Sequence, residues 1–274
     1  MTRLALDGVL VLAGAGKMGG ALLSGWLTRG LDPARVIVQD PAPPPEVRAL
    51  LEAHGIVSRS TLDPSMPPPA VLLMAVKPQV MDAVFPPLAR LAAQETLVVS
   101  IAAGRKIAAF ERHLAPGTAV VRAMPNTPAA IGSGITVCVG NAHVTPRQKA
   151  VCDALLGAVG EVAWVDDETL MDAVTAVSGS GPAYVFLLAE CLAEAGVAAG
   201  LSDRLAGQLA RATVSGAGEL LRRSDLDPSV LRQNVTSPGG TTAAALSVLM
   251  APSGLSELLT KAVAAAAKRS RELG

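Results

Sequence analysis

The chain has few aromatic residues, no excess of charge of either sign and little histidine. Phe, Trp and Tyr make up 2% of its 274 residues, and 23 basic side chains balance 23 acidic ones. Because the net charge is zero, no global field favours nucleic acid or an anionic membrane, and we expect neither as a partner. Hydrophobic residues reach 50%. The core is therefore expected to consist mainly of Ala, Val and Leu.

Histidine and cysteine are too scattered for a metal site or a disulfide framework. Neither type shows ligand spacing, and the cysteines form no C-x-x-C pair. The residues concerned are His54, His113, His143, Cys138, Cys152 and Cys191. An odd number of unpaired cysteines favours a reducing compartment, so we expect a cytoplasmic protein without a metal. The apolar, uncharged stretch 173–189 is broken by Ser-Gly-Ser-Gly-Pro, so no membrane span is expected.

The stretch 9–23 (VLVLAGAGKMGGALL) is the one around which the chain is organised. An apolar run typical of a buried parallel strand stops at the glycine turn, and residues at helical spacing follow. Gly14 permits the tight turn, Gly16 lets the backbone approach a diphosphate, and Gly19 lets the helix lie close to the strand. The pattern predicts a dinucleotide site at Gly14, Ala15, Gly16, Lys17 and Met18. A merely tight glycine turn is the alternative.

Apolar runs recur after this loop and alternate with turn and helix signals. This alternation predicts a Rossmann-type doubly wound sheet, an α/β domain over 1–165. The expected strands cover 9–13, 35–39, 71–76, 97–101, 120–123, 135–139 and 162–165.

Several side chains follow these strands, where ligands collect in a parallel sheet. Asp40 comes about twenty residues after the glycine loop, where a carboxylate would accept from the adenosine ribose; a turn aspartate before a proline is equally compatible. Lys77 ends another strand, either beside the cofactor or in solvent. Ala102, Ala103 and Gly104 leave room for a flat ring or a ribose. Asn126 is fixed between two prolines and suits a nicotinamide edge, although the segment is also an ordinary turn signal.

From residue 166 onward the pattern predicts helices alone, and we expect an all-α domain over 166–274. Its many Ala and Gly residues leave little bulk for a core, so a second copy is expected to complete that core in a homodimer. The segment 236–242 (TSPGGTT) is the second candidate site. Its glycines and the amides of the following helix would accept an anion, with Ser237, Thr241 and Thr242 adding hydroxyls. A flexible turn with an ordinary cap is the alternative.

No histidine stands beside an acid, and this bears on the reaction. Reduction of a ketone normally needs a proton donor at the carbonyl oxygen. An imine nitrogen can already carry the proton near neutral pH, so hydride transfer to it needs mainly positioning and a dry pocket.

Taken together, the motifs resemble those of the pyrroline-5-carboxylate reductases over nearly the whole chain. They read VLAGAGKMGGAL, MAVKPQ, VVSIAAG, VVRAMPNTP, DAVTAVSGSGPAYVF and NVTSPGGTT. The resemblance implies a Rossmann domain followed by a helical domain that interlocks in a dimer, often assembled into a decamer. It also implies reduction of (S)-1-pyrroline-5-carboxylate to L-proline with NADPH or NADH, the last step of proline biosynthesis.

The resemblance also implies roles for particular residues. The coenzyme would be lined by Gly14 to Met18, Ala75, Val76, Lys77, Pro78, Ala102, Ala103, Gly104 and Asn126. The substrate carboxylate and ring nitrogen would be held by Asn234, Ser237, Gly240, Thr241 and Thr242, with Ser237 and Thr242 as catalytic residues. Glu168 and Thr175 would complete the pocket from the dimer partner. Many members carry Ser, Thr or Arg where this chain has Gln39-Asp40-Pro41, so the preference for NADPH stays open.

Two other functions would share some of these sequence features. A β-hydroxyacid-type or other imine reductase would be expected to carry a lysine in its interdomain helix, and 169–199 contains none. A nucleotide-sensing or scaffolding protein would bind the dinucleotide without turnover, and the second ligand loop argues against it.

Overall fold

A computed structural model describes residues 3–273, which form two compact units. The first unit runs to Gly179 and includes the chain again from Ala267, whereas the second is Ser180–Ala266. The predicted boundary at 165/166 rests on sequence pattern rather than on this packing.

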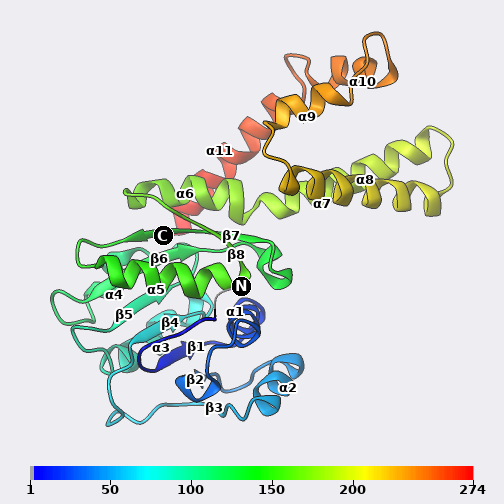
Figure 1. The fold of residues 1–274 in the computed structure, drawn as a ribbon. Helices are drawn as coiled ribbons and strands as arrows, with labels where there is room; N and C mark the ends of the chain where they lie inside the picture. Colours follow the sequence, from blue (N-terminus) through cyan, green and yellow to red (C-terminus); the bar gives the residue numbers. More distant parts are fainter. Residues whose placement is uncertain (1–2, 274) are drawn as a thin grey trace. The chain divides into compact units, whose positions relative to one another are not determined.

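The first unit is built on one sheet of eight strands (Figure 1). The strands are β1 (Leu10–Ala13), β2 (Val36–Gln39), β3 (Ser58–Arg59), β4 (Val71–Met74), β5 (Leu97–Ser100), β6 (Ala119–Met124), β7 (Gly134–Gly140) and β8 (Gly160–Trp164). Their order is β3-β2-β1-β4-β5-β6-β7-β8, which begins with the order of dinucleotide-binding sheets. This confirms the predicted fold class.

Strand β7 is antiparallel to β6, while all other neighbouring strands are parallel. A parallel crossover needs about a dozen residues or more. The connection 125–133 is shorter and holds only the 3₁₀ turn η3 (Thr127–Ile131), so the chain turns back on itself. The sequence analysis did not specify this reversal.

Helices cover both faces of the sheet, as its mainly apolar central strands require. One layer holds α1 (Lys17–Thr28), α2 (Pro45–Ala53) and α5 (Pro146–Leu156), and the other holds α3 (Met81–Ala89), α4 (Ile107–Glu111) and α6 (Met171–Val174). Alternate residues of β1 serve the two layers. Leu10 and Leu12 belong to the first core, and Val11 and Ala13 to the second.

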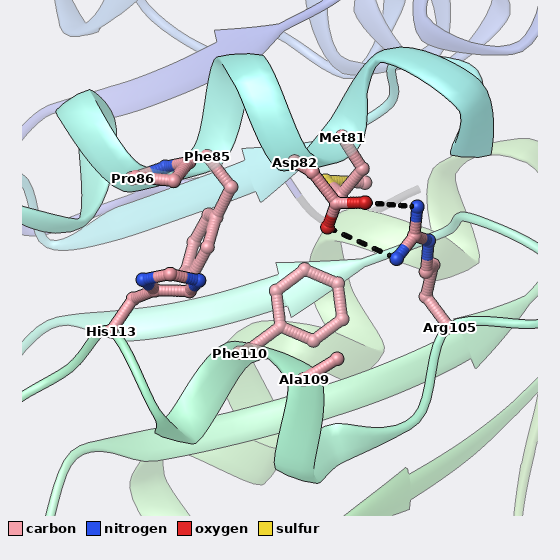
Figure 2. A pocket seen from close by; sticks show the side chains of 8 residues that line it. All are labelled: Met81, Asp82, Phe85, Pro86, Arg105, Ala109, Phe110 and His113. Atoms are coloured by element: carbon pink, nitrogen blue, oxygen red, sulfur yellow. Dashed lines mark hydrogen bonds and ion pairs between the residues drawn. The ribbon is translucent and has the colours of Figure 1, made fainter.

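Three aromatic side chains fix the helix layers, a departure from the expected core of Ala, Val and Leu. Trp26 is fully buried, and its Nε1 donates to the carbonyl of Leu155 at 2.8 Å, joining α1 to α5. Phe85 of α3 meets Phe110 of α4 edge to face, with ring centroids 4.9 Å apart (Figure 2). The strands themselves have the predicted aliphatic composition, but the few aromatics hold helix to helix.

The segment after β8 is helical but is not one regular α-helix. It consists of the 3₁₀ turn η5 (Glu168–Leu170), the short α6, and a π-helical turn η6 over Thr175–Gly179. The Ser-Gly-Ser-Gly sequence therefore widens the helix rather than ending it. Such π turns are rare and are frequent at functional sites.

The second unit is helical throughout. It contains α7 (Gly181–Ala198), α8 (Asp203–Arg223), α9 (Pro228–Asn234), α10 (Thr241–Leu249) and most of α11 (Leu255–Leu273). Helices α7 and α8 pack through small residues, since a Cβ on Gly196 would lie 3.1 Å from that of Ala206. Among the described residues of this unit only Ala206 and Ala210 are buried, whereas Phe186 is 61% exposed. The expected lack of core bulk is confirmed.

We predict that Gly19→Ala destabilises the first unit. An added Cβ would collide with the carbonyl oxygen of Gly14 and approach Ala75 Cβ to 3.3 Å. This strain should outweigh the better helix propensity of Ala and lower the free energy of unfolding by about 1–3 kcal/mol.

The matched control is Gly16→Ala, where a Cβ meets no described atom within 4 Å and φ is −68°. Urea unfolding should show little change for this variant. Equal stability of the Gly19→Ala variant and the unmodified chain would contradict the tight packing of α1 on β1.

Candidate active site

The glycine loop is held against the ends of the neighbouring strands. Gly14 has φ +91°, and its N–H donates to the carbonyl of Gln39 at 2.8 Å. A Cβ there would lie 2.8 Å from the carbonyl carbon of Ala75. Only glycine fits this position, because both the backbone conformation and the close approach of β4 exclude a side chain.

The N-terminus of α1 is open to a ligand. The helix begins at Lys17 with Gly16 as its cap, and its first turn, Lys-Met-Gly-Gly, carries no carboxylate. A Cβ added at Gly16 would meet no described atom of other segments within 4 Å. The first amides of a helix have no partner within it, and the positive end of the helix dipole lies there too, so the residues present fit a dinucleotide diphosphate.

Asp40 lies at the glycine loop but already has backbone partners. Its Oδ2 accepts from the N–H of Ala15 at 2.7 Å, and its Oδ1 accepts from that of Ala42 at 2.9 Å. The carboxylate thus forms the turn that ends β2 and also touches the predicted coenzyme loop. Its contact with a ribose stays a prediction.

Arg105 joins the two loops that follow β4 and β5. Its Nη2 donates to the carbonyl of Pro78 at 2.8 Å, and its guanidinium makes a two-pronged pair with Asp82 at 2.8 and 3.0 Å (Figure 2). This hydrogen bonding lowers the pKa of Asp82. The loop after β5 carries buried Ala102, exposed Ala103 and buried Gly104, and Lys77 is exposed in the other loop. Sequence analysis missed Arg105, although it directly follows the small residues of that loop.

Asn126 stands where β6 ends. Its Oδ1 accepts from the N–H of Ile135 at 3.0 Å, tying the turn to β7. The side-chain amide nitrogen is then the group suited to donate to a ligand. Ala75 and Val76 are half-buried at the neighbouring end of β4, where Ala75 N–H donates to the carbonyl of Ala13 at 2.7 Å.

A buried ion pair sits between β6 and the segment after β8. Arg122, the one charged residue of β6, has a side chain only 6% exposed, and its Nη1 lies 3.1 Å from Glu168 Oε1. The same oxygen accepts from the N–H of Ile107, the first residue of α4, at 2.9 Å. Glu168, expected in a substrate pocket, therefore joins three elements of the first unit. The signal for Arg122 was a charge inside an apolar strand, which demands a partner.

Thr175 is likewise engaged in the first unit. Its hydroxyl donates to the carbonyl of Met171 at 2.8 Å, one turn back along the chain. Substrate roles for Glu168 and Thr175 stay predictions.

The second candidate loop joins α9 to α10 in the second unit. Gly239 has φ +70°, and Gly240 caps α10 with its N–H donating to the carbonyl of Ser237 at 3.0 Å. The first turn of α10, Thr-Thr-Ala-Ala, carries no carboxylate. Asn234, Ser237 and Thr241 are exposed, and Thr242 is half-buried. The structure thus brings the predicted anion-accepting residues together around one helix N-terminus.

Two features of the described residues bear on metal and membrane binding. Among residues 3–273 no three His, Cys, Asp or Glu side chains gather as a metal site would require. One helical run, Glu168–Ala198, is long and apolar enough to cross a membrane by length and composition alone, and 6% of its most apolar window is buried. The absence of a membrane partner therefore stays a prediction.

A Rossmann sheet with a glycine loop, followed along the chain by a helical unit with a predicted anion-accepting loop, is typical of a nicotinamide-dependent oxidoreductase. A model described as pyrroline-5-carboxylate reductase dimerisation matches residues 168–273, and one described as NADP oxidoreductase, coenzyme F420-dependent, matches 9–104. The pyrroline-5-carboxylate reductase of Pseudomonas aeruginosa is 40% identical over 96% of both chains, and that of Synechocystis is 48% identical over 74% of this chain and 75% of its own.

Solved structures agree with these relatives. A pyrroline-5-carboxylate reductase from Coxiella burnetii superimposes with a TM-score of 0.89 at 34% identity, covering 98% of this chain and 99% of its own. The Plasmodium falciparum enzyme with NADP bound gives 0.80 at 28% identity and covers 98% of both chains. The chain belongs to the pyrroline-5-carboxylate reductase family. The resemblance drawn from its motifs, and with it the predicted class of NAD(P)-dependent oxidoreductase, is confirmed.

We predict that Glu168→Ala lowers the free energy of unfolding by about 1–3 kcal/mol. The change leaves the buried Arg122 guanidinium without its carboxylate partner. The predicted loss is kept modest because the Glu168 side chain is 27% exposed to solvent. Thermal or urea unfolding measures the effect.

Two comparisons isolate the cause. Adding Arg122→Met to the same chain should recover much of the loss, because no buried charge is then left unpaired. Asp82→Ala breaks an exposed ion pair and should matter much less. If the double variant loses as much free energy of unfolding as Glu168→Ala alone, or more, the argument is contradicted.

Proposed function

We propose that this chain catalyses the reduction of (S)-1-pyrroline-5-carboxylate to L-proline with NADPH or NADH. Family membership supports the reaction, and the open N-terminus of α1 at Gly16 is the observation that carries the coenzyme site. The loop at the start of α10 supports a substrate that bears a carboxylate.

The coenzyme, when bound, supplies the hydride. The segment Gly14 to Met18 would line its diphosphate, with amides at the start of α1 as donors, because the amides of Gly14 and Ala15 already donate to Gln39 and Asp40. Asp40 would lie by the adenosine ribose. The segments 75–78 and 102–104 would flank the coenzyme, and Arg105 fixes these two loops relative to each other. Asn126 would face the nicotinamide end.

The substrate would be gripped by its acid group. Asn234, Ser237, Gly240 and Thr241 would surround the carboxylate, with amides of the first turn of α10 as donors, because the N–H of Gly240 already donates to Ser237. The Thr242 hydroxyl would hydrogen-bond the ring nitrogen. Because the imine nitrogen can carry its proton beforehand, no histidine is needed as a general acid. Thr242 and Ser237 are therefore the proposed catalytic residues, acting through position and hydrogen bonding.

A homodimer would complete the second unit. Large apolar side chains such as Phe186, Leu187 and Leu209 are exposed on α7 and α8, and the family model matched over 168–273 describes dimerisation. A second copy would bury these side chains. Burial in a dimer would also explain why the helical run 168–198 is so apolar, with no need for a membrane. Glu168 and Thr175 would then border the partner's substrate loop. Further assembly to a decamer and a cytoplasmic location belong to the same proposal.

We predict that Thr242→Ala lowers kcat by roughly tenfold or more, since one hydrogen bond to the reacting nitrogen is lost in the transition state. Steady-state rates with pyrroline-5-carboxylate, followed by the absorbance of the reduced coenzyme, provide the measurement. Thr236→Ala is the matched control, because its hydroxyl already donates to the carbonyl of Arg232 at 2.6 Å. An unchanged kcat for Thr242→Ala removes it from the catalytic residues.

The same assay with NADPH and NADH side by side tests the reaction and the role of Asp40. We predict that Asp40→Ser raises the ratio of kcat/KM for NADPH over NADH by about tenfold or more, because a carboxylate repels the 2′-phosphate. Asp32→Ser is the control, since that residue caps the turn before β2. Turnover with neither coenzyme would refute the proposed function, and an unmoved ratio would refute only the role of Asp40.

A further inference from the structure

Ser178 has a hydroxyl that the ligand-free fold leaves unpaired. Its Oγ is buried and has no hydrogen-bond partner among the described residues, a condition it shares only with Oε1 of Gln39. A buried polar atom without a partner is costly and normally signals a missing ligand or water, or a functional role. Ser178 lies in the π-helical turn, within the first unit.

Two other hydroxyls in helical segments are paired locally. Those of Thr175 and Thr260 each donate to the carbonyl four residues earlier. This back-bonding is the usual solution for Ser and Thr in helices. Within the π turn Thr175 makes this bond, whereas the Ser178 hydroxyl does not.

The position of the π turn points to a particular ligand group. Gly179 lies against the end of β6, since an added Cβ would be 2.6 Å from Met124 Cε. Pro125 and Asn126 follow directly along the chain. In a sheet of this order, the half formed by β4, β5 and β6 receives the nicotinamide end of the dinucleotide. Met124 is half-buried and has a flexible side chain that can move for a ligand.

We propose that Ser178 is a coenzyme-binding residue whose hydroxyl pairs with the nicotinamide carboxamide. A hydroxyl both donates and accepts, and a carboxamide offers both complementary groups. Movement of the Met124 side chain opens the turn to the ligand. This inference rests on the proposed function, because it requires that the chain bind a nicotinamide dinucleotide.

The test compares the whole coenzyme with its adenosine half. Ser178→Ala should weaken binding of NADPH or NADH, titrated by their fluorescence without substrate, by about three- to tenfold, the effect of one lost hydrogen bond. Binding of ADP-ribose, which lacks the nicotinamide, should not change. The melting temperature of the ligand-free protein should stay level or rise, because an unpaired buried group has been removed. Ser24→Ala, at an exposed position of α1, is the control.

The outcomes separate this inference from others. Unchanged coenzyme affinity overturns it, and so does equal weakening of coenzyme and ADP-ribose, which would indicate a general distortion. Ser178→Cys, of similar size but a weak donor, should behave like Ser178→Ala and serves if that variant folds poorly. If the unmodified chain binds neither coenzyme, the proposed function itself is refuted. If it binds a coenzyme tightly and Ser178→Ala does not change that affinity, only the role of Ser178 is refuted.

Discussion

The ion pair between Arg122 and Glu168 is the interaction on which the first unit most depends. A guanidinium inside a parallel sheet is strongly unfavourable unless a carboxylate meets it, and that carboxylate comes from beyond β8. Because Glu168 Oε1 also accepts from the start of α4, the pair fixes the end of the loop 102–106. Glu168 therefore both compensates the buried charge of Arg122 and holds the end of a predicted coenzyme loop in place.

The rest of the coenzyme region is made by backbones in close approach. Gly14 lies against Ala75, Gly19 lies against Gly14, and Arg105 ties the loop after β5 to Pro78. Small residues let strands and helices come close enough for amides rather than side chains to form the surface. Such a surface suits a diphosphate, which needs several N–H donors and little bulk.

Sequence reasoning was strongest where a local pattern encodes the backbone. The glycine loop, the apolar strands and the Pro-led helices need only neighbouring residues to be recognised, and the structure has them close to where they were predicted. It failed where the partner is distant or geometric. Glu168 lies 46 positions from Arg122, the reversal at β7 follows from a short connection, and a π turn has no composition signal. The roles assigned to single site residues remain predictions, because they concern ligands.

The helical unit poses a different constraint, which links stability to function. With two buried alanines, it cannot be stabilised by its own apolar core. Its two covalent connections help, since the chain leaves the first unit at Gly179 and returns at Ala267, where buried Ser270 donates to Asp172 at 2.6 Å. Tethers reduce the entropy of the unfolded chain but bury no apolar surface. The proposed homodimer would meet this constraint, because a second copy would cover the exposed leucines and so stabilise the unit that carries the proposed substrate loop.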